Sequence, residues 1–209
     1  YGQPATDIEG IDLIDVLANH DGMMQQGNNG PIFALLALDS GNYEVADSQW
    51  NRETLLEAIL DAQLDDGSWA LTGDMGSADM TGLALSALSP YKDDDQVATA
   101  MKKAKQWIID NMSAEGFYDE YSDGYPSESI AQVMIGLIAA GEDPTSETFT
   151  KNGIHLVQSL LTFQTDASGF RHLVTDEEGN PLSTNQALLA LAAFQEKVSV
   201  FHLNDNVSG

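Results

Sequence analysis

The chain lacks cysteine altogether and has few basic residues. Without cysteine it can form no disulfide, no thiolate nucleophile and no cysteine-ligated zinc site. It has 8 Lys and Arg residues against 33 Asp and Glu residues, which gives a formal net charge of −25. Nucleic acids and anionic lipid surfaces are bound by clustered cations, so this excess of acid excludes both as direct partners.

Long apolar runs are also missing. The longest, residues 130–140, is interrupted by Gln132 and falls well short of the roughly 20 residues that a spanning helix needs. We therefore expect no direct membrane insertion. The chain begins at Tyr1 rather than Met, so we expect its original N-terminus to lie upstream. The missing signal peptide then says nothing about secretion.

What the chain does contain is an internal repeat. Apolar residues make up 43% of the sequence, enough for one domain over residues 1–209. Segments rich in alanine, glycine and leucine recur and predict helices that are apolar nearly all round, near residues 30–40, 78–89, 127–141 and 183–196. Amphipathic segments precede them and predict outer helices with one buried face. The predicted repeats span about residues 7–43, 50–91, 94–141 and 145–197.

A glycine followed by an aromatic residue separates the two helices of each later repeat. The three copies are Gly67-Ser68-Trp69, Gly116-Phe117-Tyr118 and Gly169-Phe170. Glycine just past a helix end usually adopts a left-handed conformation that stops the helix. Each repeat is thus predicted to contain an outer helix, a turn and an enclosed inner helix. We predict an all-α fold in which such hairpins form a curved array.

The motifs of this repeat resemble a known family. The segment Gln63–Trp69 matches the Q-x-x-x-G-x-W signature of the squalene-cyclase and prenyltransferase repeat. Further segments are similar, in the same order, to the prenyltransferase-repeat regions of clostridial-type cell-surface proteins: 29–40, 78–85, 127–133, 151–153 and 184–188. The first repeat departs most, because it lacks both the glutamine and the tryptophan.

This resemblance implies a fold and a location. The fold would be an α/α toroid of the terpenoid-cyclase and protein-prenyltransferase type, here a segment of about four helical hairpins. Complete toroids of the family have five or six hairpins, so this one would be incomplete or open. The location would be extracellular, on the surface of a Gram-positive bacterium, with neighbouring domains in the same polypeptide.

The catalytic motifs of the family do not carry over. Asp93-Asp94-Asp95-Gln96 lacks the last acid of the Asp-x-Asp-Asp cyclase motif, and Asp65-Asp66 does not continue into Asp-Asp-x-x-Asp. The zinc site of the prenyltransferases and the thioester of the complement-like proteins both need cysteine. No histidine pair has metalloprotease spacing. We therefore assign no catalytic residue, no metal ligand and no cofactor, and the sequence leans against an enzyme.

The starts of the inner helices hold the candidate binding residues. In a toroid these starts gather at one end together with the aromatic turns, and would form a shared concave pocket. The ligand-binding candidates are Asp79, Glu128, Asn185, Trp69, Tyr118, Tyr121 and Phe170. For each residue alone there is a structural alternative. Polar residues at helix starts cap free N–H groups, and the rings can pack between repeats.

Three functions remain open. The first is a non-catalytic binding or adhesion domain, whose partner is a small molecule, glycan or protein at the toroid mouth. The second is a terpenoid cyclase-like or other carboxylate-dependent enzyme, in which Asp79 and Glu128 would do acid–base work. The third is a structural spacer. An enzyme predicts a perturbed carboxylate pair in a closed pocket, whereas a binding module predicts no such pair.

The net charge generates the first testable prediction. Repulsion among the acidic side chains disfavours the compact state, and salt screens it. Adding sodium chloride should therefore raise the thermal unfolding midpoint, measured by circular dichroism at neutral pH. A midpoint that stays constant or falls with salt would show that this repulsion is unimportant.

Overall fold

The structure is a computed structural model that describes residues 4–118, 124–166 and 169–201. Within these residues the chain is mostly helical, as the sequence predicts. Its helices are α1 (Leu13–Ala18), α2 (Asn29–Ser40), α3 (Arg52–Asp61), α4 (Ala78–Leu88), α5 (Asp95–Asn111), α6 (Ser127–Ala139), α7 (Leu156–Leu161) and α8 (Pro181–Glu196). Short 3-10 helices lie at Met23–Gln26 (η1), Ser89–Tyr91 (η2) and Glu147–Phe149 (η3).

Two small antiparallel hairpins accompany the helices. Strand β1 (Thr150–Lys151) pairs with β2 (Ile154–His155), and β3 (Gln164–Thr165) pairs with β4 (Gly169–Phe170). The first hairpin corrects one detail of the sequence analysis. The apolar residues before the fourth inner helix predict a longer outer helix, but the chain enters β2 at Ile154 and α7 begins only at Leu156.

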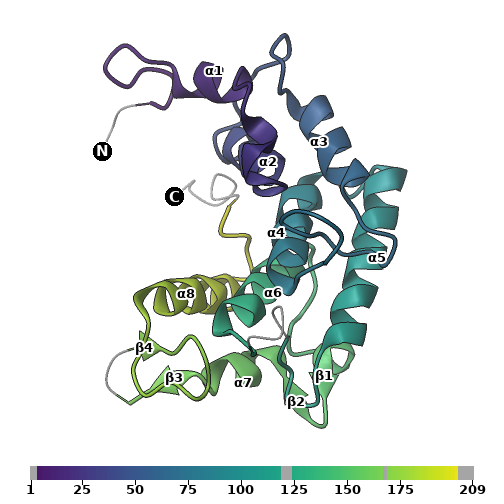
Figure 1. Ribbon diagram of the computed structural model, residues 1–209, viewed down its shortest axis with the longest axis vertical. Helices are drawn as coiled ribbons and strands as arrows, with labels where there is room; N and C mark the ends of the chain where they lie inside the picture. Colours follow the sequence, from purple (N-terminus) through teal and green to yellow (C-terminus); the bar gives the residue numbers. More distant parts are fainter. Residues whose placement is uncertain (1–3, 119–123, 167–168, 202–209) are drawn as a thin grey trace.

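The helices form an open arc (Figure 1). Helices α2, α4, α6 and α8 follow one another along its inner side, while α3 and α5 lie outside them. Burial agrees with this arrangement. Every residue of α4 except Asp79 is buried, whereas α5 buries only one face. That face contains Val97, Met101, Ala104 and Ile108, the stripe expected from the sequence. The inner helices match the predicted segments closely.

Helices α4 and α6 approach each other through two glycines. A Cβ atom at Gly82 would overlap with the carbonyl oxygen of Gln132, and one at Gly136 would overlap with the carbonyl oxygen of Gly82. The backbones of the two helices are therefore in direct contact. Glycine inside a helix usually costs about 1 kcal/mol relative to alanine, so here close packing offsets that cost.

The turn glycines have the predicted left-handed backbone but not the predicted position. Gly67, Gly116 and Gly169 have φ angles of 95°, 79° and 107°. None follows a helix end directly, because α3 ends at Asp61, α5 at Asn111 and α7 at Leu161. Instead, each closes a tight turn further along the chain. The Gly67 N–H donates to Leu64 and the Gly116 N–H to Ser113. The helix-stop interpretation was therefore wrong.

These turns also join each repeat to the next outer helix. A Cβ atom at Gly67 would lie 2.8–2.9 Å from Lys103 of α5, and one at Gly116 would overlap with Ser159 of α7. The Gln63 amide strengthens the first junction, since its Nε2 donates to Gly67 O and to Ala100 O of α5, both at 2.9 Å. The spacing of Gln63 and Gly67 thus has a structural role between repeats.

The first helical hairpin, formed by α2 and α3, is stabilised by an arginine instead. Arg52, at the start of α3, donates from its guanidinium group to the carbonyl oxygens of Leu38 and Tyr43 and to the Asp39 carboxylate, the last at 2.8 Å. The Tyr91 hydroxyl donates to the same carboxylate. Arg52 therefore satisfies the C-terminal end of α2, where a cation also complements the helix dipole.

A matched pair of glycines tests the contact between the turn and α5. Gly67 and Gly73 both have positive φ, but nothing lies within 4 Å of a Cβ atom at Gly73. Gly67→Ala and Gly73→Ala should share the conformational strain, while only Gly67→Ala also clashes with α5. Chemical denaturation should show Gly67→Ala to be the less stable by about 1–3 kcal/mol. Equal losses would mean that the contact between the turn and α5 contributes nothing.

Candidate functional site

The N-terminal ends of α4, α6 and α8 meet around one buried carboxylate, that of Glu128. It is the second residue of α6, and its side chain is only 8% exposed. Its Oε1 accepts a hydrogen bond of 2.6 Å from the hydroxyl of Ser183 on α8. Its Oε2 lies 2.9 Å from Nδ1 of His172. Glu128 thus links two inner helices and the loop that precedes α8.

His172 is placed by its neighbours in the loop. The Ser127 N–H donates to the His172 carbonyl oxygen at 2.9 Å, and the Ser127 hydroxyl donates to the Arg171 carbonyl oxygen at 2.7 Å. The Arg171 guanidinium group donates to backbone carbonyl oxygens of the same region. The His172 side chain itself is 49% exposed. It therefore connects the buried Glu128 carboxylate to solvent.

Asp79, the second residue of α4, lies on the other side of this network. Burial raises the pKa of the Asp79 carboxyl above its ordinary value. The negative charge of Glu128 raises it further, while a hydrogen bond with Ser129 and the charge of His172 oppose the shift. Among the described residues, the buried Oδ1 of Asp79 has no hydrogen-bond partner. Asp79 therefore keeps one buried oxygen whose hydrogen-bonding capacity the described residues do not use.

Neither acid acts as the cap of its own helix. Helix α4 is capped by Ser77, whose hydroxyl accepts from the Met80 N–H. Pro126 precedes α6 and supplies no side-chain cap. Glu128 is held from outside its helix by Ser183 and His172. The capping alternative considered for Asp79 and Glu128 therefore gives way to a network between helices.

This arrangement pairs a carboxyl that favours its neutral form with a carboxylate that accepts hydrogen bonds. Burial makes it harder for Asp79 to lose its proton, and among the described residues its Oδ1 has no hydrogen-bond partner. A buried acid with a raised pKa beside a second acid is suited to binding polar groups and to acid–base chemistry. Both capacities arise from the same few side chains.

The aromatic candidates lie in the core. Trp69, Tyr118 and Phe170 are buried. The Trp69 ring donates from Nε1 to the Ile59 carbonyl oxygen at 2.7 Å, so it contacts α3 of its own predicted repeat. Burial raises the pKa of Tyr118, and among the described residues its hydroxyl has no partner. These rings therefore belong to the hydrophobic core.

The two remaining candidates have different outcomes. Asn185 lies on the exposed side of α8, while Tyr121 falls outside the described residues. Sequence reasoning missed His172, Ser129 and Ser183 as members of the network. A signal existed for Ser183, because aligning Ala187 with Ala131 places it opposite Ser127 in the repeat. No pattern in the sequence singled out His172, which reaches Glu128 from a loop.

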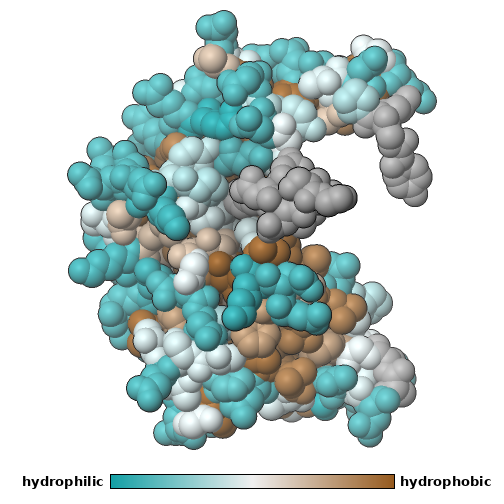
Figure 2. Space-filling view, turned by 180° about the vertical axis from the view of Figure 1, so that it is seen from behind, coloured by the Kyte–Doolittle hydropathy of each residue, from teal (hydrophilic) through white to brown (hydrophobic). Residues whose placement is uncertain are grey.

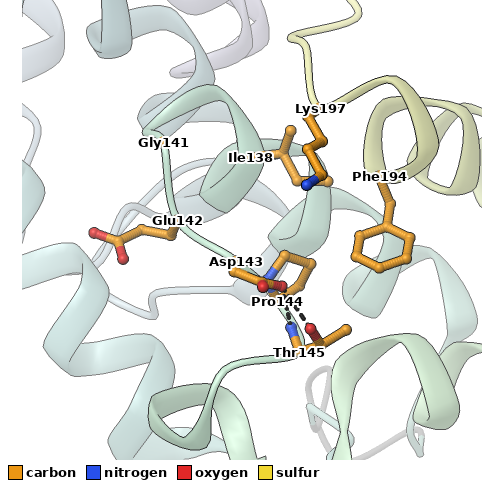
Figure 3. Close-up of a pocket in the computed structure, with 8 residues that line it drawn as sticks. All are labelled: Ile138, Gly141, Glu142, Asp143, Pro144, Thr145, Phe194 and Lys197. Carbon is orange, nitrogen blue, oxygen red and sulfur yellow. Dashed lines mark hydrogen bonds between the residues drawn. The ribbon is translucent and has the colours of Figure 1, made fainter.

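Two cavities lie away from this network. One of about 300 Å³ lies between the C-terminal ends of α6 and α8 (Figure 3). Ile138, Phe194 and Lys197 border it, together with Asp143. Hydrogen bonds from Thr145 lower the pKa of Asp143. Another cavity, of about 310 Å³, lies between α1 and α2. Neither touches Asp79 or Glu128.

Within residues 4–118, 124–166 and 169–201, no three histidine or acidic side chains group as metal ligands do. In the same ranges, no helix has the length and apolar character needed to cross a membrane. The chain matches no protein-family model, and a comparison with curated proteins found no match.

The raised pKa of Asp79 predicts a pH-dependent cost to stability. A carboxyl that holds its proton more tightly in the folded state stabilises the fold below its ordinary pKa of 3.8. That contribution is lost as pH rises through the folded-state pKa. Asp79→Asn keeps the shape without the charge, so it should raise the unfolding midpoint at pH 7, and the gain should shrink toward pH 4.

Asp93→Asn is the matched control, because it removes one acid from an exposed loop. It should change the midpoint little at either pH. If Asp79→Asn instead lowered the midpoint at pH 7, the ionised carboxylate would be stabilising and the burial argument would be wrong. Circular dichroism melts of the three proteins across this pH range measure the difference.

Proposed function

We propose that this chain is a ligand-binding segment of an α/α-toroid repeat domain from a bacterial cell-surface protein. Its partner would be a small molecule, a glycan or a protein, held outside the cell where α4, α6 and α8 begin. The open arc of inner and outer helices supports the toroid class (Figure 1). The repeat motifs support membership of the prenyltransferase-like family and, through that resemblance, the location.

One observation carries the proposal, namely the unsatisfied Asp79 oxygen beside the Glu128 network. An unpaired buried oxygen costs free energy on folding, and so does a carboxyl that is buried next to another acid. Proteins retain such destabilising groups where the free energy of ligand binding compensates for their cost. A ligand that donates a hydrogen bond, such as a hydroxyl, amide or ammonium group, would satisfy Asp79 Oδ1.

An acid–base enzyme is the second candidate, favoured by the raised pKa of Asp79 next to the charge of Glu128. For an enzyme, we expect both a perturbed carboxylate pair and a closed pocket around it. The raised pKa of Asp79 beside Glu128 corresponds to the first of these two features. The cavities described above lie away from the pair. Because the catalytic motifs of the family are absent from the sequence, the binding function stands first.

Ligand-observed NMR with a library of small hydroxyl, amide and amine fragments tests the proposal. Fragments should bind the unaltered chain, and the signal should be lost in Asp79→Asn and in Ser183→Ala, which removes a hydroxyl from Glu128. Asp93→Asn should bind as the unaltered chain does, because it changes charge without touching the network.

Other outcomes separate the alternatives. Fragments that bind all four proteins equally would place the binding elsewhere and overturn this site. No binding by any fragment class would favour a structural spacer. Fragments that are converted by the unaltered chain but not by Asp79→Asn would favour the enzyme.

A further inference from the structure

The cavity between the C-terminal ends of α6 and α8 contains a cation and an anion that do not pair with each other. Lys197 follows α8, Asp143 lies in the loop after α6, and both border the cavity (Figure 3). Among the described residues, the Lys197 ammonium group takes part in none of the ion pairs. The two charges are nevertheless near enough to interact, since Lys197 adds to the effect of Thr145 in lowering the pKa of Asp143.

Lys197 occupies a position that favours glycine. Its φ of 56° and ψ of 35° are left-handed. Aligning Ala187 with Ala131 places Lys197 opposite Gly141, which has a φ of 82° just after α6. The left-handed conformation costs free energy for a residue with a side chain, but little for glycine. A lysine kept here at a cost indicates that its charge has a use in this cavity.

The Asp143 carboxylate is fixed through one of its two oxygens. Its Oδ1 accepts hydrogen bonds from the Thr145 N–H at 2.8 Å and from the Thr145 hydroxyl at 2.7 Å. Among the described residues, no hydrogen bond reaches its Oδ2. Glu142 also borders the cavity, but it pairs with Lys105 of α5 at 2.7 Å. Asp143 is therefore the acid of this lining that can pair with a ligand.

The rest of the lining is largely apolar. Ile138 and Pro144 are buried, and the Phe194 ring packs partly against the core. Helix α8 has Glu196 as its one charged residue, and Figure 2 shows hydrophobic side chains gathered over this part of the molecule. Charges beside apolar surface interact more strongly than charges in open water. The volume of about 300 Å³ lies at the lower end of the range for small-molecule sites.

These charges select the kind of ligand. A ligand with only positive charge is repelled by Lys197, and one with only negative charge is repelled by Asp143 and by the net charge of −25. A zwitterion satisfies both side chains and has no net charge. The C-terminal ends of α6 and α8 also favour a cationic group near Asp143, because carbonyl oxygens are concentrated there.

We propose that this cavity binds a free α-amino acid with an apolar side chain. The amino-acid carboxylate accepts hydrogen bonds from Lys197, and its ammonium group donates to Oδ2 of Asp143. Its side chain packs between Ile138 and Phe194. The site lies at the opposite end of α6 from Glu128, and it goes beyond the proposed function because it uses different residues.

Isothermal titration calorimetry at neutral pH tests the zwitterion requirement, in salt that screens the net charge. L-leucine should bind once per chain. N-acetyl-L-leucine lacks the ammonium group and L-leucinamide lacks the carboxylate, so each should bind about tenfold more weakly or worse, because each loses a charge-assisted hydrogen bond. Glycine should also bind more weakly, since it has no side chain to pack.

Matched lysine substitutions locate the site. Lys197→Gln should weaken L-leucine binding about tenfold or more, whereas Lys102→Gln should not, because Lys102 is exposed on α5. Asp143→Asn keeps an oxygen for Thr145 but removes the charge, so it should weaken binding as Lys197→Gln does. Lys197→Gly should lose binding and yet raise the thermal unfolding midpoint, since glycine relieves the left-handed strain.

Several results would overturn the proposal. They are no binding of L-leucine by the unaltered chain, equal binding of L-leucine and N-acetyl-L-leucine, and unchanged binding by Lys197→Gln. Loss of L-leucine binding in Asp79→Asn, with Lys197→Gln unaffected, would place the amino acid at the starts of the inner helices instead. That outcome would overturn this site and leave the proposed function standing.

Discussion

The direct backbone contact between α4 and α6 is the constraint on which the rest of the arrangement depends. It exists because Gly82 and Gly136 carry no side chain where the two helices touch. This close approach fixes the spacing of the inner helices and brings the start of α4 next to the start of α6. Asp79 can then interact with Ser129 and with the charge of Glu128. A wider spacing would separate the two acids.

The positions of the outer helices depend on a second feature, the turn that precedes each inner helix. Its left-handed glycine leaves room for the next outer helix, and the Gln63 amide bridges the turn to α5. Asp66 adds a further link, because its carboxylate accepts a hydrogen bond from the Trp107 ring. These contacts run from each repeat to the next, so the array is stabilised mainly between neighbours.

The acidic residues are distributed according to the cost of burying their charge. Most of the acidic residues lie on solvent-exposed loops and outer helices, where charge costs little. The exceptions, Asp79 and Glu128, lie at the inner-helix starts, where serine hydroxyls and His172 compensate part of the cost of burial. Helix α8 is the opposite case, with leucines exposed and almost no charge.

The helical class and the bounds of the inner helices were determined by sequence alone, because the apolar periodicity of the repeat is local and strong. The positions of Asp79 and Glu128 at helix starts were readable for the same reason. Only the tertiary structure decided what these acids contact, since Ser183 is 55 residues from Glu128 and His172 comes from a loop without a periodic pattern. The turn glycines make the same distinction. Their left-handed conformation was predictable from residue type, whereas their distance from the helix ends depended on packing against the next repeat.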